Sequence, residues 1–258
     1  MTEFRPNRFE ILPVIIKNLI IINGLFFLAQ NVNEQQHWLD IDQWLALHTW
    51  QSSMFKPWQF VTHLFLHGNF SHLLSNMFAL WMFGSILENL WGGQRFLLFY
   101  ISCGIGAALC HMGVLYIENA AIVKDFYALN PLTADGNPTT AYFIQKYLSV
   151  PQNVPITYDI ARQVLNARLD EATIGASGAV FGCLAAFGFL FPNTKLYIYF
   201  FFPVKAKWFV LGYAAVELVL ATNNSAGDNV AHVAHLGGAL VGLILVYFWN
   251  KKNRRHFY

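Results

Sequence analysis

The amino-acid sequence predicts an all-α, multi-pass membrane protein. Hydrophobic residues make up 56% of its 258 residues, charged residues make up 12%, and the mean hydropathy is +0.40. Soluble domains carry about 25% charged residues, so this composition disfavours a soluble fold. Intrinsic disorder is excluded because it requires low hydrophobicity and high charge. The net charge of +2, without a basic run in the middle of the chain, argues against a nucleic-acid partner.

Six segments are apolar enough to cross a bilayer, which takes about 17–25 residues. They are apolar on all sides rather than along one stripe, which disfavours a soluble helical bundle. In chain order they are residues 11–30, about 71–88, 95–116, 174–191, about 196–221 and 230–249. The polar stretch after Gln30 offers no small-residue cleavage site, so the first segment does not match a cleaved signal peptide. Pro192 ends the fourth segment, and a basic run closes the sixth.

An even number of crossings places both ends of the chain on one side of the membrane. Most Lys and Arg residues lie on that side, whereas the other side holds Lys56, Lys124, Lys146, Arg162 and Arg168. The positive-inside rule therefore predicts that both termini are cytoplasmic. The first outer loop carries interfacial tryptophans, namely Trp38, Trp44, Trp50 and Trp58. We expect an integral protein of the plasma membrane, which in a bacterium is the inner membrane.

Two outer segments are too long for simple connections. Residues 31–70 are rich in Trp and Leu and predict short interfacial helices, for example over residues 38–45. Residues 118–172 form an extracytoplasmic insertion long enough to need its own structure. Within it, residues 159–169 have apolar positions at helical spacing after an Asp cap at Asp159, which predicts an amphipathic helix. We treat residues 1–258 as a single domain that carries this insertion.

Polar groups inside a membrane are costly and mark candidate functional sites. Ser177 lies in Gly175-Ala176-Ser177-Gly178 at the start of the fourth segment. The tetrapeptide alone favours a small-residue helix contact. A serine at a helix N-terminus can also act as a nucleophile, because the free backbone N–H groups there stabilise an oxyanion.

His235 lies within the sixth segment, three residues before Gly238. Gly238 and Gly242 form a Gly-x-x-x-Gly face that allows close helix approach. If this face meets a small-residue face on the fourth segment, the imidazole reaches Ser177 within the roughly 2.6–3.2 Å that a general base requires. His232, one turn earlier, is interpreted as a solvated interfacial residue.

His72 and Asn76 are four residues apart and share one helix face of the second segment. Both can donate hydrogen bonds to an oxyanion, although interhelical hydrogen bonding is an alternative role. Glu88 is interpreted as a capping residue or as a partner of Arg95. Glu217, in the fifth segment, has His111 as a candidate partner, without a decisive argument.

Several histidines near the outer half raise the alternative of a metal site: His63, His67, His72, His232 and His235. The chain has no His-Glu-x-x-His motif, no paired cysteines and no carboxylate expected near His235. Cys103, Cys110 and Cys183 lie in apolar runs, where they resemble small buried hydrophobic residues rather than a disulfide framework. We therefore predict no metal ion.

Taken together, these residues resemble the rhomboid family of intramembrane serine proteases. The resemblance covers most of residues 55–245. It rests on His72-x-x-x-Asn76, the stretch from Glu88 to Gly92, Gly175-x-Ser177-Gly178 and Ala234-His235-x-x-Gly238-x-x-x-Gly242, with Trp58, His63 and His67 upstream. The motifs occur in order, each on the expected segment. Two departures are Gln59, where the family often has Arg, and the length of residues 118–172.

The resemblance implies a six-transmembrane-helix rhomboid-like bundle with a Ser–His dyad and no third acid. It implies Ser177 as the nucleophile and His235 as the general base. His72, Asn76 and the Ser177 backbone N–H would form the oxyanion hole, and Phe181 would pack on the catalytic imidazole. The fifth segment would be a lateral gate in the lipid bilayer. The substrates would be transmembrane proteins whose helices unwind locally, and no cofactor would be needed.

Two other function classes compete with this interpretation. A catalytically inactive rhomboid-like protein that binds membrane clients would lack the serine or the histidine, and both are present. A transporter would show inverted repeats, and the two halves of the chain show none.

Overall fold

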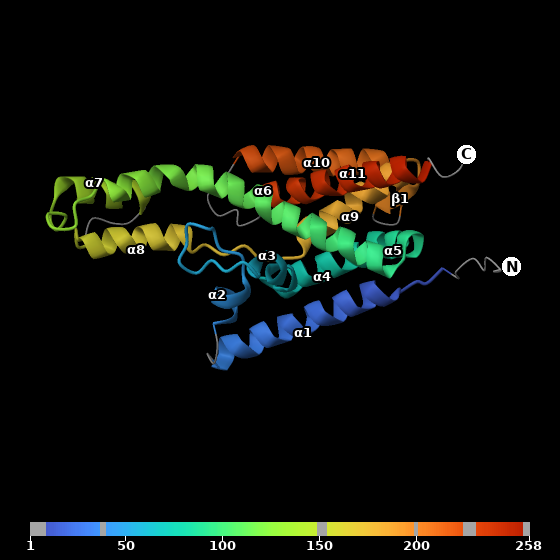
Figure 1. Ribbon diagram of the computed structural model, residues 1–258, viewed down its shortest axis with the longest axis horizontal. Coiled ribbons are helices and arrows are strands. Elements are labelled where there is room, and N and C mark those ends of the chain that lie inside the picture. Colours follow the sequence, from blue (N-terminus) through green and yellow to red (C-terminus); the bar gives the residue numbers. More distant parts are fainter. Residues whose placement is uncertain (1–8, 37–39, 149–153, 199–200, 224–230, 255–258) are drawn as a thin grey trace.

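The computed structural model describes residues 9–36, 40–148, 154–198, 201–223 and 231–254. Helices dominate these residues and confirm the predicted all-α membrane bundle (Figure 1). The main helices of the bundle are α1 (Val14–Gln36), α4 (Phe70–Ala79), α5 (Ser85–Trp91), α6 (Gly93–Tyr127), α9 (Ser177–Leu190), α10 (Ala206–Asn223) and α11 (His232–Arg254). A short π-helical turn, η2 (Leu80–Gly84), joins α4 to α5, so that residues 70–91 form one continuous span.

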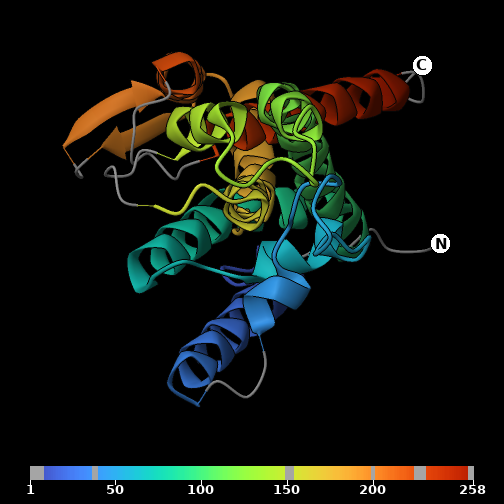
Figure 2. The ribbon, with the colours of Figure 1, turned by 90° about the vertical axis from the view of Figure 1, so that its left-hand side faces the viewer.

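Four spans among the described residues are long and apolar enough to cross a membrane, namely Val14–Asn33, Phe70–Trp91, Gly93–Tyr127 and His232–Lys251. The predicted fourth segment corresponds to α9, which is apolar and has 14 residues, and the fifth contains α10, with 18 residues. Helix α1 lies along one outer edge of the bundle and α10 along the opposite edge (Figures 1 and 2). Helix α1 begins and α11 ends at the same end of the bundle, as an even number of crossings requires. The cytoplasmic orientation of that end stays a prediction.

The predicted start of the fifth segment is wrong. Residues 195–205 form an antiparallel hairpin of β1 (Lys195–Ile198) and β2 (Phe202–Lys205), with Lys195 opposite Lys205. The hairpin projects from the bundle beside α10 (Figure 2). Aromatic and β-branched residues suit a strand as well as a membrane helix, and hydropathy does not separate the two in a short apolar run.

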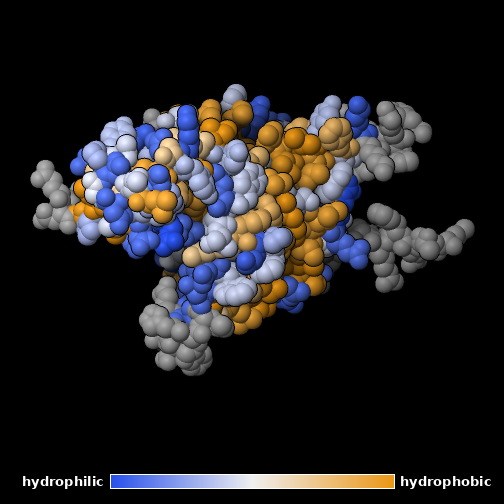
Figure 3. Space-filling model, turned by 60° about the vertical axis from the view of Figure 1, so that its left-hand side comes forward, coloured by the Kyte–Doolittle hydropathy of each residue, from blue (hydrophilic) through white to orange (hydrophobic). Residues whose placement is uncertain are grey.

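The insertion has a hydrophobic core of its own. Helix α6 continues to Tyr127 instead of ending near residue 116, and α7 (Pro138–Tyr147) and α8 (Tyr158–Leu169) pack on its last turns. The buried residues of this core are Ile122, Phe126, Phe143, Ile144, Ala161, Val164, Leu165 and Leu169. Figure 1 shows this part projecting from one end of the bundle, and Figure 3 shows a mainly hydrophilic surface there, next to a hydrophobic band across the bundle.

The amphipathic helix predicted over residues 159–169 is confirmed as α8, but its cap is different. The side chain of Thr157 accepts a hydrogen bond from Ile160 N, and Asp159 lies in the first turn. A short helix in the first outer loop is also observed, as α2 (Ile41–Leu45), capped by the side chain of Asp40. Residues 37–39, where this helix was predicted to begin, lie outside the described residues.

Gln59, in α3 (Gln59–Thr62), anchors the first outer loop. Its side chain is fully buried, and its Oε1 accepts hydrogen bonds from the backbone N–H groups of His48 and Lys56. Its Nε2 donates to the carbonyls of Gln43 and Met54. The neutral amide of Gln59 therefore anchors the loop at the position where the resemblance would place an arginine.

The interpretation of Glu88 as a capping residue is confirmed, although the helix that it caps is α1. Its two carboxylate oxygens accept hydrogen bonds from the backbone N–H groups of Ile15 and Ile16, each at 2.9 Å. A carboxylate is favoured at a helix N-terminus because the unpaired N–H groups and the helix dipole are positive there. Arg95 instead lies over the ring of Trp249, 4.3 Å from its centroid.

Helices α9 and α11 cross at very short distance through glycines. A Cβ atom on Gly238 would overlap the backbone of Gly178, and one on Gly242 would lie 2.7 Å from the carbonyl oxygen of Gly182. The small-residue faces predicted for the fourth and sixth segments therefore meet each other. Close approach of this kind lets backbones pack directly where lipid provides no hydrophobic driving force.

Candidate active site

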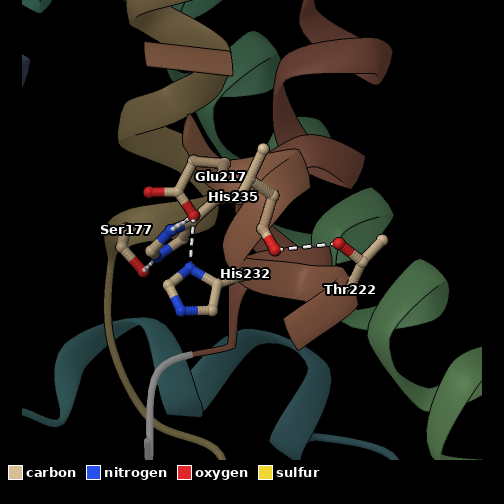
Figure 4. A network of polar contacts seen from close by, with 6 residues as sticks. Ser177, Glu217, Thr222, His232 and His235 are labelled. Atoms are coloured by element: carbon tan, nitrogen blue, oxygen red, sulfur yellow. Dashed lines mark hydrogen bonds and ion pairs between the residues drawn. The ribbon is translucent and has the colours of Figure 1, made fainter. Parts of the chain in front are cut away.

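The structure brings Ser177 and His235 together, although they are 58 residues apart in the chain. Ser177 is the first residue of α9, and His235 lies in the first turn of α11. The Oγ atom of Ser177 lies 2.8 Å from Nε2 of His235 (Figure 4). The Gly178–Gly238 crossing sets this distance, because it places the starts of both helices side by side. His235 is buried and Ser177 is half-buried.

The backbone before Ser177 depends on Gly175. This residue has φ +126°, a conformation that glycine adopts easily and other residues rarely adopt. A Cβ atom there would lie 2.9 Å from two atoms of the His72 ring. The Gly175 N–H donates to the His63 carbonyl at 2.9 Å. Glycine thus lets the chain pass the His72 ring and enter α9 at Ser177.

The first outer loop holds the same segment from the other side. Leu47 and Thr173 exchange backbone hydrogen bonds of 3.0 and 2.8 Å. His48 donates from Nδ1 to the carbonyl of Asp170 at 3.0 Å, and Ser52 donates to the Asp170 carboxylate at 2.5 Å. These contacts connect the loop to the end of the insertion, a few residues before Ser177.

The imidazole of His235 is held on one face by Phe181, one turn after Ser177. The two rings are parallel, with 4.3 Å between centroids and 5° between planes. Tyr213 of α10 packs against Phe181, with 5.1 Å between ring centroids. The aromatic contact implied by the resemblance is therefore present.

His72 and Asn76 line α4 beside this pair. Gly68 N–H contacts Nδ1 of His72 at 3.4 Å, so the proton of the neutral ring is assigned to Nε2, on the side of Gly175. Asn76 is buried, and its Nδ2 has no hydrogen-bond partner among the described residues. A buried donor without a partner is costly, and such groups are often found where a ligand or a reacting group completes the bond.

The sequence analysis singled out Glu217 of α10 but did not predict that it contacts His235. Its Oε2 lies 2.9 Å from Nδ1 of His235 and 2.7 Å from Nδ1 of His232 (Figure 4). The expectation of no carboxylate near His235 is therefore wrong. His232 is buried rather than solvated, which corrects its interpretation as an interfacial residue. His111, the candidate partner of Glu217, instead contacts the Thr173 hydroxyl through Nε2 at 3.1 Å.

The sequence contained one signal for Glu217. A carboxylate in the middle of an apolar helix is expensive without a partner, and the fifth segment is joined directly to the sixth, which carries two histidines. Sequence spacing alone does not show which side of α10 faces α11, so it cannot identify the partner.

Glu217, His232 and His235 also form the one candidate group of metal ligands among the described residues, with ligand atoms within 4.8 Å of one another. The Nδ1 atoms of His232 and His235 both lie at hydrogen-bond distance from the same carboxylate oxygen of Glu217. Hydrogen bonds therefore satisfy these polar atoms without a metal ion. The absence of a metal ion stays a prediction.

Outside the spans, burial lowers the pKa of His63 and of His67 to about 4, which keeps both rings neutral at pH 7.

Comparison with known proteins gives one consistent family. The Rhomboid domain matches residues 54–121 and 141–252, and the stretch between these two parts lies in the end of α6 and the insertion. An uncharacterized mitochondrial rhomboid protein of Schizosaccharomyces pombe is 28% identical, covering 88% of this chain and 61% of its own length. The chloroplastic rhomboid-like protein 11 of Arabidopsis thaliana is 28% identical, covering 90% of this chain and 64% of its own length.

A putative rhomboid protease of Bacillus subtilis is 25% identical, with coverage of 78% of this chain and 71% of that protein. The chain spans less than two thirds of the length of the Schizosaccharomyces pombe and Arabidopsis thaliana relatives. The first two relatives are mitochondrial and chloroplastic proteins, and the third comes from a bacterium. These relatives therefore do not support the predicted plasma (bacterial inner) membrane over an organelle membrane. The apolar helices and these relatives together identify an integral membrane protein.

Proposed function

The chain belongs to the rhomboid family, and from this we propose that it is an intramembrane serine endopeptidase with Ser177 as nucleophile and His235 as general base. The observation that carries the proposal is the 2.8 Å contact between Ser177 Oγ and His235 Nε2. A nucleophilic serine needs a base at this distance, because its hydroxyl is unreactive while it holds its proton.

The reaction follows from the positions of the two groups. Nε2 of His235 takes the hydroxyl proton while Ser177 Oγ attacks the scissile carbonyl carbon, and the carbonyl oxygen becomes an oxyanion. Nε2 then gives the proton to the leaving amine, so the peptide C–N bond breaks and an acyl-enzyme remains. Water attacks the ester through the same base, which releases the acid and restores Ser177.

Side-chain donors on α4 and backbone donors at the start of α9 support stabilisation of the oxyanion. The unpartnered Nδ2 of Asn76 and the Nε2–H of His72 lie on α4. The amides of residues 177–179 precede the first hydrogen bond within α9, from Val180 N to the Ala176 carbonyl. Donors that are in place before the reaction lower its barrier without reorganisation.

The substrates that this geometry favours are transmembrane segments of other proteins. Ser177 lies inside a bundle of apolar helices, and α10, beside the site, exposes apolar side chains such as Leu211, Val216 and Leu218. A segment in lipid keeps its backbone hydrogen bonds, so cleavage requires local unwinding. We expect small or helix-breaking residues near the cut, and α10 as the side of entry.

The test is a cleavage assay in liposomes with a reporter fused to a transmembrane segment that contains such residues. We expect wild-type protein to cleave it and Ser177→Ala to leave it intact. Ser75→Ala removes an exposed hydroxyl on α4 and is expected to cleave normally. Equal cleavage by the wild type and Ser177→Ala would refute the proposal. Binding of the segment without cleavage would favour a client-binding protein.

Asn76→Ala is expected to lower kcat by about 10²- to 10³-fold, because it removes one oxyanion donor. KM should change by less than about threefold, since this bond is made in the transition state rather than in the bound substrate. Initial rates across substrate concentrations separate the two constants. A change in KM alone would assign Asn76 to substrate binding instead.

A further inference from the structure

The carboxylate of Glu217 occupies an unusual position for a membrane helix. Its side chain is 6% exposed, and α10 is otherwise largely apolar. Burial of an unpaired carboxylate in an apolar environment is energetically costly. Here one oxygen, Oε2, accepts from two imidazole Nδ1–H groups, those of His232 and His235. The described residues thus hold the acid in one geometry, and one of its partners is the candidate base.

The contact with Glu217 determines which nitrogen of His235 is free. A carboxylate accepts hydrogen bonds, so Nδ1 of His235 carries the proton and donates it to Oε2. In a neutral ring, Nε2 then presents a lone pair, and this is the atom 2.8 Å from Ser177 Oγ. Phe181 restrains the plane of the ring, and Glu217 restrains its rotation within that plane.

We propose that Glu217 completes a Ser177–His235–Glu217 triad, as a positioning residue that holds the reactive tautomer of His235 and stabilises the imidazolium formed during attack. This inference rests on the proposed function and extends it beyond a Ser–His dyad. The carboxylate gains no proton in any step: the proton passes from Ser177 Oγ to Nε2 and on to the leaving amine. The positive ring and the negative carboxylate are then 2.9 Å apart.

His232 has a separate part in this arrangement. It donates from Nδ1 to the same oxygen at 2.7 Å, from the turn of α11 before His235. The second donor keeps Oε2 directed toward α11 and satisfies more of its hydrogen-bonding capacity in an apolar environment. The two imidazole rings are nearly perpendicular, with 6.1 Å between centroids, so they do not compete for one position.

The other titratable groups around His235 come from each neighbouring helix. Tyr213 of α10 interacts electrostatically with Glu217, whereas His72 of α4 and His111 of α6 interact with His235. Within this described set, Glu217 is the one carboxylate. Loss of the Glu217 charge therefore removes the counter-charge of the imidazolium.

Glu217→Gln keeps the size of the side chain and removes its charge. We expect kcat to fall by about 10²- to 10⁴-fold with KM within about threefold, because the tautomer is no longer held. Glu217→Asp keeps the charge and should recover at least tenfold of the lost rate.

Thr222→Val serves as the matched control on α10. Its hydroxyl donates to the Val219 carbonyl within the same helix, so its loss should leave kcat and KM as in the wild type. A purely structural role of Glu217 would lower the amount of folded protein and leave kcat of the folded fraction at the wild-type value. That result, or wild-type kcat in Glu217→Gln, would overturn the inference.

A second measurement uses the wild-type protein and is independent of any variant's folding. In protein labelled with ¹⁵N-histidine, the His235 signals are those missing from His235→Ala. We expect the neutral ring of His235 to carry its proton on Nδ1, and an Nε2–H tautomer would overturn the inference. If Glu217→Gln cleaves normally while Ser177→Ala is inactive, the proposed triad is refuted and the proposed protease function is retained. If Ser177→Ala also cleaves, the proposed function itself fails.

Discussion

His235→Ala is expected to lower kcat for peptide-bond cleavage by about 10⁴- to 10⁶-fold, with KM within a few-fold of wild type. Without the imidazole, no group lies at 2.8 Å from Ser177 Oγ to take its proton. The oxyanion donors and the substrate contacts remain, so a residual rate above that of uncatalysed hydrolysis is also expected. Single-turnover cleavage in liposomes, compared with the wild type, measures the loss.

The double variant Ser177→Ala/His235→Ala separates a catalytic pair from two independent residues. Because the two groups act as one unit, the double variant should be no slower than either single variant. Leu240→Ala removes an exposed side chain on α11 and is expected to cleave as the wild type does. Additive losses, or less than a tenfold loss in His235→Ala, would contradict the assignment of His235 as the base.

Gly238→Ala is expected to reduce both stability and activity. Its Cβ would overlap the backbone of Gly178, and a backbone cannot move aside as the end of a flexible side chain can. Helices α9 and α11 must therefore separate. We expect the free energy of unfolding to fall by an amount at the upper end of the roughly 1–3 kcal/mol that overpacking costs. The same shift moves His235 away from Ser177, and a displacement of about 1 Å can cost about 10²-fold in rate.

Gly113→Ala provides the matched control, because nothing lies within 4 Å of the added Cβ and the residue is inside α6. Thermal unfolding in detergent should show a clear drop for Gly238→Ala and no drop for Gly113→Ala. The folded fraction of Gly238→Ala should cleave about 10²-fold more slowly. Wild-type stability and rate in Gly238→Ala would show that the close crossing does not set the Ser177–His235 distance.

The parts of the fold that could be predicted from sequence are those that depend on local composition. Apolar runs identify the membrane segments, and the apolar spacing within residues 159–169 identifies α8. The partnership of Ser177 with His235 was also predictable, because small residues around each allow close helix approach. In each case the signal lies within one segment or in two segments with matching faces.

The parts that failed depend on three-dimensional neighbours. The apolar run from Leu196 to Val204 suits a strand as well as a membrane helix, so hydropathy alone did not predict the hairpin. The last turns of α6 pack on α7 and α8 instead of lipid, so this part of the helix is half polar. Hydropathy therefore did not predict these turns. Glu217 could be recognised as unusual, but its partner depends on the rotation of α10 against α11.

The most direct test of the central claim, that His235 activates Ser177, is covalent labelling with a fluorophosphonate followed by peptide mapping. We expect a single modified serine in the wild-type protein, at residue 177, and almost no label in His235→Ala, because the probe reacts with a serine whose proton is being removed. Equal labelling of His235→Ala, or a label on another residue, would contradict the account.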